Sequence, residues 1–437
     1  MTLKLFESAV EWLYVNYYRT TSKEALNMGE RALPYASYVE QRGMAIRPSQ
    51  SVQDIYGKDF VYNPKLYARD YQHFADDWLS LEALTGRELS VLGNMPIVCH
   101  EAAVTEAALD LFQKAGLQVP SVRYTYRNDL EYIQLLHKLR KQNKKIIFQY
   151  PHPVEEVPSD QYWVEPDVLA YVSDKRNIPE LVPPENVPDR KMMSLDQILK
   201  EKPALPIILK TGDGRPTSGG CGVLLIEKEE QLYEIGESFG DLSNIIVEEY
   251  IPYDQNFGFH YVADKTGEIR FLGKSEQIIN EDSCFRGSWI SKDEDNMSHI
   301  IEAGYRVMKK IAEKGYVGMA GFDVLIRGDR FYFIDLNIRF NASTSGLMLY
   351  DDLQKKEGKE IVRLCNLEWQ DDFQDLVPIL EKYVMDRQFV PLSVLDAGYF
   401  EGENRASKVI GLVTGHSREE VTGVLDEMDR DGLCHRE

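Results

Sequence analysis

Cysteine is scarce and scattered in this chain, because its five cysteines share no C-x-x-C spacing. The sequence therefore indicates neither a zinc site nor a disulfide framework. Long apolar runs are missing too, and no stretch approaches the roughly 18 residues of a membrane span. The first residues, MTLKLFESAVEW, have neither the apolar core nor the cleavage site of a signal peptide. We therefore expect a cytoplasmic protein.

Positive charge is in short supply, since the formal net charge is −21. Nucleic-acid binding needs a basic face, so this balance argues against DNA or RNA as a partner. A nucleotide is still compatible, because it needs only a few local cations. The chain has 437 residues, of which 43% are hydrophobic and 28% charged. This composition is that of a globular protein, and the length predicts about two to three domains.

Several common nucleotide and catalytic motifs are absent as well. No G-x-G-x-x-G follows the apolar segment 92–99, and the chain contains no G-x-S-x-G nucleophile motif. That segment is followed by a predicted helix (101–114), a strand (122–126), a helix (130–142) and a strand ending at Tyr150. This alternation predicts a parallel sheet of the α/β class.

A basic cluster lies at the end of the helix predicted over 130–142. It spans residues 137–145 and contains one histidine, four lysines and one arginine. The cluster fits either an acidic docking partner or a solvated helix face.

The stretch 321–345, GFDVLIRGDRFYFIDLNIRFNASTS, places carboxylates inside apolar strands. A polar turn containing Gly328 separates its two apolar runs, which predicts an antiparallel hairpin. If the hairpin closes at this turn, Asp323 lies near Asp335 and Asn337. Buried carboxylates need a proton or a cation, and oxygen ligands of this kind suit Mg²⁺ or Mn²⁺. A solvated strand face with both carboxylates pointing outwards fits the same pattern.

Lys210 closes the apolar strand LPIILK and is followed by a loop rich in glycine and then by a second apolar strand. Backbone N–H groups of such a loop can cover phosphates, although a plain flexible hairpin fits equally. The loop is not a Walker A motif, because no G-K-[ST] follows. Further along, we expect a hairpin over 257–277, a loop carrying Arg286, and helices over 297–314, 357–369 and 375–386.

Taken in order, SDKRNIPELVPPENVP, LPIILK, TGDGRPTSGGCG, IIVEEYI, GFDVLI and FIDLNIRFNAS resemble the ATP-grasp superfamily of carboxylate ligases over about residues 172–353. The resemblance implies an α/β (α+β) protein in which two α+β subdomains clasp ATP behind an N-terminal pre-ATP-grasp domain with a parallel-type sheet. The implied domains are a pre-ATP-grasp domain (1–165), a lid-bearing subdomain (166–250), a metal-binding subdomain (251–360), and a C-terminal helical segment with a strand returning to the grasp domain (361–437).

The resemblance also implies binding roles, residue by residue. The residues expected at the phosphates are Lys175, Lys210 and the lid glycines Gly214, Gly219 and Gly220. Those expected at the adenine are Glu248 and the backbone of Glu249, Tyr250 and Ile251, with Gln255 or Asp254 at the ribose. The implied Mg²⁺ ligands are Asp323, Asp335 and Asn337, with Asp335 standing where the family usually has Glu. The implied catalytic residues are Arg339, Arg286 and Lys274.

The chemistry implied is activation of a carboxylate by ATP as an acyl phosphate, with release of ADP, followed by attack of a nucleophile. The chain resembles the pheganomycin-type peptide ligases of natural-product pathways and the butirosin-pathway ligase that attaches glutamate to an acyl carrier protein. We therefore expect an amino acid such as glutamate to be loaded onto a carrier protein in antibiotic biosynthesis. The alternatives are a peptide ligase that acts on free amino acids or peptides, and a nucleotide-binding protein without catalysis.

Overall fold

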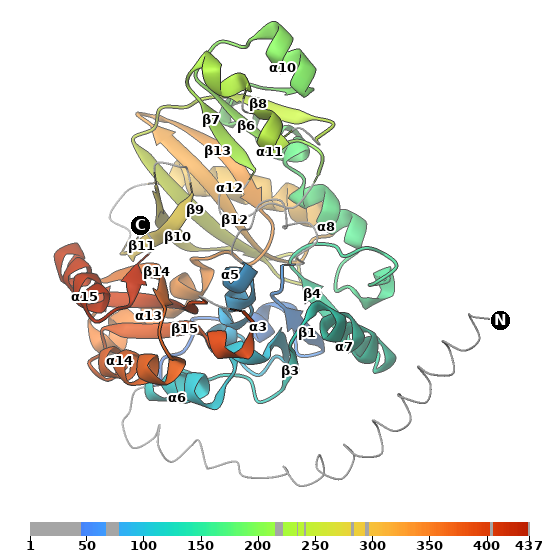
Figure 1. Ribbon diagram of the computed structural model, residues 1–437. Coiled ribbons are helices and arrows are strands. Elements are labelled where there is room, and N and C mark those ends of the chain that lie inside the picture. Colours follow the sequence, from blue (N-terminus) through green and yellow to red (C-terminus); the bar gives the residue numbers. More distant parts are fainter. Residues whose placement is uncertain are drawn as a thin grey trace. The chain divides into compact units, whose positions relative to one another are not determined.

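The computed structural model describes residues 45–66, 78–214, 222–233, 235–239, 242–280, 284–292, 297–402 and 405–435. The elements in these ranges form three sheets, and Figure 1 labels most of their strands. Of the residues predicted at the phosphates, Gly219 and Gly220 lie outside the described ranges. Among the residues that the structure describes, no helix combines the length and the apolar character needed to cross a bilayer.

The first sheet is parallel, with the order β3-β2-β1-β4, and confirms the predicted α/β alternation. Its elements are β1 (Phe60–Asn63), β2 (Ile97–His100), α6 (Glu106–Lys114), β3 (Arg123–Tyr126), α7 (Asp129–Lys141) and β4 (Lys145–Phe148). The apolar run 92–99 was expected to be strand throughout, but β2 begins only at Ile97, after the short helices α5 (Trp78–Ala83), η1 (Leu84–Gly86) and η2 (Leu89–Val91). The apolar residues Leu92, Met95 and Ile97 of this run are all buried, so its apolar pattern does not distinguish strand from helical turn.

The second sheet is antiparallel, with the order β5-β8-β6-β7. Its elements are β5 (Arg190–Met193), α10 (Leu195–Glu201), β6 (Ile207–Thr211), β7 (Val223–Ile226), α11 (Ile235–Phe239) and β8 (Ile245–Glu249). Ser194 caps α10 in a capping box with Gln197. β6 carries Lys210 next to the Gly-rich loop, and β8 carries Glu248.

The third sheet has the order β13-β12-β9-β10-β11-β14-β16-β15, and β17 pairs with β14. Its strands are β9 (Gln255–Ala263), β10 (Ile269–Ile279), β11 (Phe285–Ser291), β12 (Gly318–Arg327), β13 (Arg330–Asn337), β14 (Ile361–Trp369), β15 (Phe389–Leu395), β16 (Ser407–Gly415) and β17 (Cys434–His435). The accompanying helices are α12 (Ser298–Glu313), α13 (Thr344–Glu357), α14 (Phe373–Met385) and α15 (Arg418–Arg430). The sheet thus joins the predicted metal-site hairpin to the C-terminal strands.

Two predicted elements of this sheet were wrong. The helix expected over 357–369 is in fact strand β14, which begins with β-branched Ile361 and Val362 and pairs with β11 and β16. The loop expected around Arg286 is strand β11, so Arg286 is held by ladders to β10 and β14. In both places the pairing partners are distant in sequence, and tertiary context outweighs local pattern.

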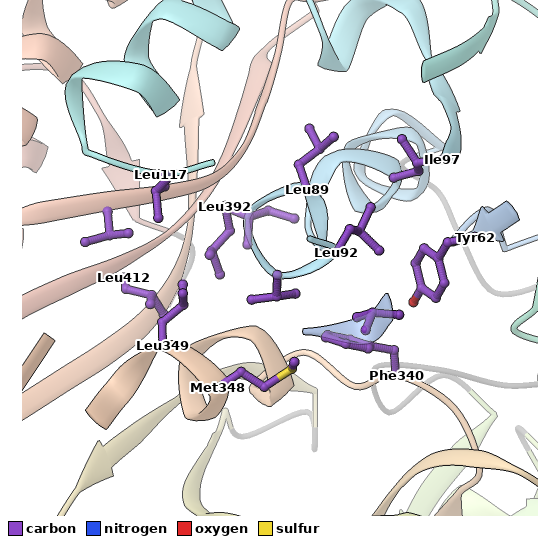
Figure 2. Packing of buried hydrophobic residues seen from close by; sticks show 14 of the residues in the cluster. Tyr62, Leu89, Leu92, Ile97, Leu117, Phe340, Met348, Leu349, Leu392 and Leu412 are labelled. Carbon is purple, nitrogen blue, oxygen red and sulfur yellow. The ribbon is translucent and has the colours of Figure 1, made fainter. Parts of the chain in front are cut away.

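A single apolar core connects the N-terminal parallel sheet with the C-terminal strands (Figure 2). Leu89 and Leu92 come from the segment before β2, and Leu392 and Leu412 come from β15 and β16. Met348 of α13 packs into the same cluster. Because this core is shared, the helices α5 and η1 are held against the face of the large sheet that carries the site described next.

Candidate active site

The β12–β13 hairpin closes as predicted. Asp323 is the register partner of Asp335, and Gly321 is the partner of Asn337. A β-bulge follows Asp323, so that Ile334 has no direct partner in the ladder. The Ile334 carbonyl instead accepts a hydrogen bond of 2.8 Å from Lys210 Nζ. The bulge therefore connects the metal-type side chains of the large sheet to the lysine of the second sheet.

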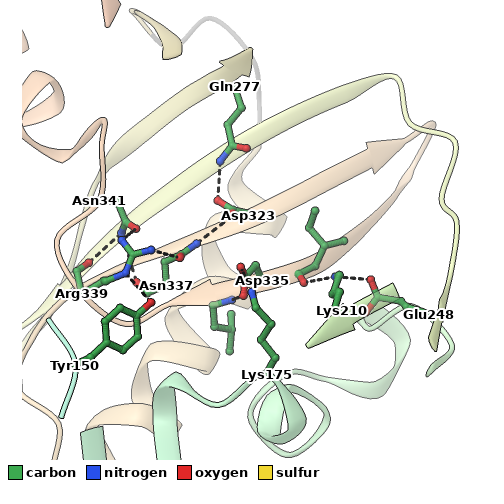
Figure 3. A network of polar contacts seen from close by, with 12 residues as sticks. Tyr150, Lys175, Lys210, Glu248, Gln277, Asp323, Asp335, Asn337, Arg339 and Asn341 are labelled. Atoms are coloured by element: carbon green, nitrogen blue, oxygen red, sulfur yellow. Dashed lines mark hydrogen bonds and ion pairs between the residues drawn. The ribbon is translucent and has the colours of Figure 1, made fainter. Parts of the chain in front are cut away.

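Asp323 lies between two amide side chains (Figure 3). Its Oδ1 accepts a hydrogen bond of 2.6 Å from Gln277 Nε2, and its Oδ2 accepts one of 3.0 Å from Asn337 Nδ2. Burial, followed by the charge of Asp335, raises the pKa of Asp323 to about 6. A positive charge close to Asp323 would therefore stabilise its ionised form near neutral pH.

Asp335 already has a positive charge beside it, because Lys175 forms an ion pair with its Oδ2. Burial acts to raise the pKa of Asp335, but the charges of Lys175 and Lys210 outweigh it and hold this pKa below its usual value. The two partners come from different parts of the chain, Lys175 from the segment after α8 (Pro166–Ser173) and Asp335 from β13.

A second buried ion cluster surrounds Glu248 of β8. Lys210 Nζ donates to Glu248 Oε1 at 2.5 Å, and Arg190 pairs with Oε2 of the same carboxylate. Burial lowers the pKa of Lys210, against the opposing charge of Glu248. Both lysines of the site are thus buried beside carboxylates. Two ammonium groups are thus already in place on one side of the site to bind a polyanion.

Arg339 extends this network towards the N-terminal part of the chain. It is buried, and its Nη2 donates to Asn337 Oδ1 at 2.8 Å. Its Nε donates at 3.0 Å to the hydroxyl of Tyr150, which follows β4, and its Nη1 lies 3.3 Å from Asn341 Oδ1. The row of polar groups in Figure 3 thus runs from Gln277 through Asp323 and Asn337 to Arg339.

These groups face one cavity of about 820 Å³. This volume lies within the range of small-molecule and cofactor sites. The predicted site residues that line it are Lys175, Lys210, Glu248, Glu249, Tyr250, Ile251, Arg286, Asp323, Asp335, Asn337 and Arg339. The Nε of Arg286 is buried and has no hydrogen-bond partner among the described residues. A guanidinium in this state is suited to receive an anion from the cavity.

The structure does not bring four of the described predicted residues to the cavity, namely Lys274, Gly214, Gln255 and its alternative at the ribose, Asp254. Lys274 of β10 lies 4.5 Å from the ring centroid of Phe257 and 3.5 Å from the sulfur of Met297, among residues that do not line the cavity. Gly214 is exposed and in the left-handed region, at φ 83°. Gln255, predicted at the ribose, is exposed at the start of β9 and does not line the cavity.

The neighbours of Gln255 show what the sequence reasoning missed. Asp254 accepts a hydrogen bond of 2.8 Å from Gly328 N and so belongs to the hairpin turn. Asn256 is buried and lines the cavity, and its Oδ1 has no partner among the described residues. Gln255 and Asn256 are consecutive in a strand, so their side chains lie on opposite faces of it. Knowing where β9 begins would therefore have identified Asn256 as the cavity-facing residue. Gln277 and Tyr150 were missed because only their spatial neighbours indicate a role.

The donor set at the hairpin suits a hard divalent cation. In the part of the chain that the structure describes, no three or more His, Cys, Asp and Glu side chains cluster as a metal site. The group at the hairpin consists of two carboxylates and the amide of Asn337, whose Nδ2 donates to Asp323 and whose Oδ1 accepts from Arg339, so the ligand atoms it offers a metal are the carboxylate oxygens. The raised pKa of Asp323 also shows a carboxylate short of positive charge. These residues fit Mg²⁺, which takes one or two carboxylates together with phosphate oxygens.

Known proteins with this fold share its architecture. N5-carboxyaminoimidazole synthetase of Staphylococcus aureus, solved with ADP, aligns with a TM-score of 0.55 at 11% identity, over 89% of this chain and 99% of that chain. Biotin carboxylase of Campylobacter jejuni, solved with a β-γ-ATP ligand, gives 0.53 at 15% identity, over 86% and 92%. The biotin carboxylase domain of the Hydrogenobacter thermophilus 2-oxoglutarate carboxylase, solved with MgADP and bicarbonate, gives 0.50 at 13%, over 86% and 90%.

The fold and the family matches define an ATP-dependent ligase, and the chain belongs to the ATP-grasp superfamily of carboxylate ligases. It is an ADP-forming ligase, as the sequence motifs implied. Within this superfamily, residues 188–337 match the family described as L-aspartate–L-methionine ligase, ATP grasp. Residues 51–170 match the N-terminal domain of L-aspartate–L-methionine ligase. The resemblances to the pheganomycin-type and butirosin-pathway ligases stay predictions.

Proposed function

We propose that this protein joins two amino acids, activating the carboxylate of aspartate with ATP and transferring the aspartyl group to the amine of methionine. The observation that carries the proposal is the match of two separate segments, 51–170 and 188–337, to the same aspartate–methionine ligase. Both segments contribute to one cavity, the first through α5 and η1 and the second through β6, β8 and the β12–β13 hairpin.

Roles for the cavity residues follow from their charges. The ammonium groups of Lys175 and Lys210 exchange Asp335 and Glu248 for the phosphates of ATP. Glu248 then becomes free to accept from the adenine amino group, beside the backbone of Tyr250 and Ile251. Asn256, whose Oδ1 lacks a partner among the described residues, takes the ribose position that Gln255 was expected to hold.

The reaction centre lies at the hairpin. Asp323, Asp335 and Asn337 would hold Mg²⁺, which neutralises phosphate charge and aligns the phosphates when bound. Arg339, next to Asn337, faces the transferred phosphoryl group. Arg286 receives a carboxylate of aspartate at its buried Nε, which has no partner among the described residues.

The chemistry balances in two steps. An oxygen of the aspartate carboxylate attacks the γ-phosphorus, the bond to ADP breaks, and an aspartyl phosphate forms. The methionine ammonium gives up a proton, its nitrogen attacks the acyl carbon, and the bond to the phosphate oxygen breaks. The amide, ADP, hydrogen phosphate and one proton result. A nucleophile on the chain is not required. The enclosing cavity limits hydrolysis of the acyl phosphate.

Release of ADP and phosphate, measured with all pairs of proteinogenic amino acids, tests this proposal. We expect turnover only when aspartate and methionine are both present, with a mass of the aspartyl-methionine dipeptide among the products. A second arm adds glutamate and a holo acyl carrier protein. Turnover that requires the carrier protein would replace the dipeptide proposal with the carrier-loading function predicted from sequence. No turnover in either arm would contradict both.

A further inference from the structure

The cavity continues beyond the reaction centre to an end of different chemistry. One wall of this far end belongs to the neighbouring strands β14 and β16, and the other to α5 and η1. Its lining residues include Ser80, Leu81, Leu84, Arg87, Leu364, Asn366, Glu368, Lys408 and Ile410. Arg87 is already paired with Glu88, so the far end combines apolar surface and the Asn366 amide with the carboxylate of Glu368 and the ammonium of Lys408. None of the roles proposed for ATP, the metal or aspartate uses these groups.

Glu368 and Lys408 form an ion pair across the sheet. They are register partners in the β14–β16 ladder, and Lys408 Nζ pairs with Glu368 Oε1. Their side chains are only 14% and 7% exposed, respectively. Removing two charges from water is costly, and apolar residues of similar volume stabilise such a position equally well or better. An ion pair in the wall of a ligand cavity therefore calls for an explanation other than stability.

We propose that this far end binds the amino acid that supplies the amine. Glu368 receives its α-ammonium, Lys408 receives its α-carboxylate, and Leu81, Leu84 and Ile410 cover its side chain. This inference rests on the proposed dipeptide ligation and adds the place and polarity of the second substrate. A zwitterion carries one charge of each sign. On binding, Glu368 exchanges the ammonium of Lys408 for that of the substrate, and Lys408 exchanges the carboxylate of Glu368 for that of the substrate.

The division of charge in the cavity assigns the two substrates to different places. Arg339 brings positive charge to the hairpin, where it contacts Asn337, and Arg286 brings it to β11, the strand between β10 and β14. An acidic amino acid is favoured there. The far end has a balanced pair and apolar walls, which favour a zwitterion with an uncharged side chain. Methionine fits this end, since its flexible thioether packs against irregular apolar surface.

Two measurements on each variant separate this role from a structural one. Hydroxylamine replaces the amine and traps the aspartyl phosphate as a hydroxamate, so this reaction needs ATP and aspartate but not the far end. Dipeptide formation needs both. We expect Glu368→Gln and Lys408→Met to raise the KM for methionine about 10- to 100-fold, because each removes a charge-assisted bond to substrate. Hydroxamate formation and the KM for ATP should change less than threefold.

Matched controls use the ion pair Lys359–Glu420, whose residues do not line the cavity. Lys359→Met and Glu420→Gln should leave the KM for methionine within twofold of the wild-type value. The double exchange Glu368→Lys with Lys408→Glu keeps a cross-strand pair, so it should retain the Tm within a few degrees. It inverts the polarity offered to the zwitterion and should not restore the KM.

Three outcomes would overturn the inference. One is an unchanged KM for methionine in both single variants. Another is a loss of hydroxamate formation as large as the loss of dipeptide formation, which would place the pair in the activation step. The third is recovery of the KM in the exchanged double variant, which would show a purely structural pair. If the wild-type protein forms neither hydroxamate nor dipeptide with aspartate, the proposed function itself fails, and the subsite fails with it.

Discussion

Asp323 and Asp335 lie directly opposite each other in the β12–β13 ladder, yet their pKa values move in opposite directions. Burial and the charge of Asp335 raise the pKa of Asp323 to about 6. Lys175 and Lys210 hold the pKa of Asp335 below its usual value in spite of its burial. Asp335 is thus paired with a lysine, whereas Asp323 has no such ion pair among the described residues. A metal site without its ion is expected to be in this state.

The first prediction concerns stability. When a carboxyl group has a higher pKa in the folded than in the unfolded protein, its ionisation lowers the stability of the folded protein. Asp323→Asn removes that loss while keeping one acceptor for Gln277. Without nucleotide, we expect the variant to be about 1–2 kcal/mol more stable at pH 8, and the difference to disappear below about pH 4.

Thermal unfolding of both proteins across this pH range measures the effect, with Asp329→Asn in the exposed turn of the same hairpin as the control. Turnover of Asp323→Asn should fall at least about 100-fold, because the variant loses a charged metal ligand. A destabilised variant that keeps full activity would contradict the assignment of Asp323 to the metal.

The second prediction concerns metal affinity. A proton on Asp323 competes with Mg²⁺, so affinity for Mg²⁺ in the presence of ADP should rise by up to about tenfold per pH unit below pH 6 and level off above pH 7. Calorimetric titrations between pH 5 and pH 8 give the dependence. ADP titrates in the same range, so the quantity of interest is the ratio of wild-type to Asp323→Asn affinity. This ratio should grow through pH 6, and a constant ratio would contradict the prediction.

The third prediction distinguishes two adjacent residues of β9. Asn256 lines the cavity, whereas Gln255 is exposed and outside it. Asn256→Ala removes a hydrogen-bonding group from the nucleotide and should raise the KM for ATP about five- to tenfold. Gln255→Ala should change it less than twofold. Initial rates at varied ATP with saturating amino acids measure both, and a reversed order would return the ribose contact to Gln255.

The sequence predicted the parts of the fold that are local. The β12–β13 hairpin and the α/β alternation before Tyr150 each depend on neighbouring residues, and the structure has both. Strand β14 was mistaken for a helix because its ladders to β11 and β16 join residues far apart in the chain. Strand β1 was missed because its four residues carry no periodic signal.

The site shows the same division. The carboxylates of the hairpin interrupt an apolar pattern and could be found from sequence. Lys274 was chosen by its position in the chain, but the face of β10 on which a side chain lies is set by a β-bulge between Phe271 and Gly273, which no sequence pattern reports. Glu368 belongs to a segment misread as helix, so its pairing with Lys408 across two strands could not be anticipated.

The final prediction concerns the contact between Tyr150 and Arg339. Arg339 Nε donates to the Tyr150 hydroxyl at 3.0 Å, and its guanidinium lies 5.6 Å from the centroid of the same ring. Tyr150→Phe keeps the ring and removes the hydroxyl that accepts this hydrogen bond, at a cost of about 1–2 kcal/mol. The guanidinium should then turn away from the phosphoryl group, lowering kcat about three- to tenfold with the KM for ATP within twofold. Tyr124→Phe, on β3 at the opposite edge of the same sheet and outside the cavity, is the control. An unchanged kcat would show that Asn337 and Asn341 alone orient Arg339, without help from the N-terminal sheet.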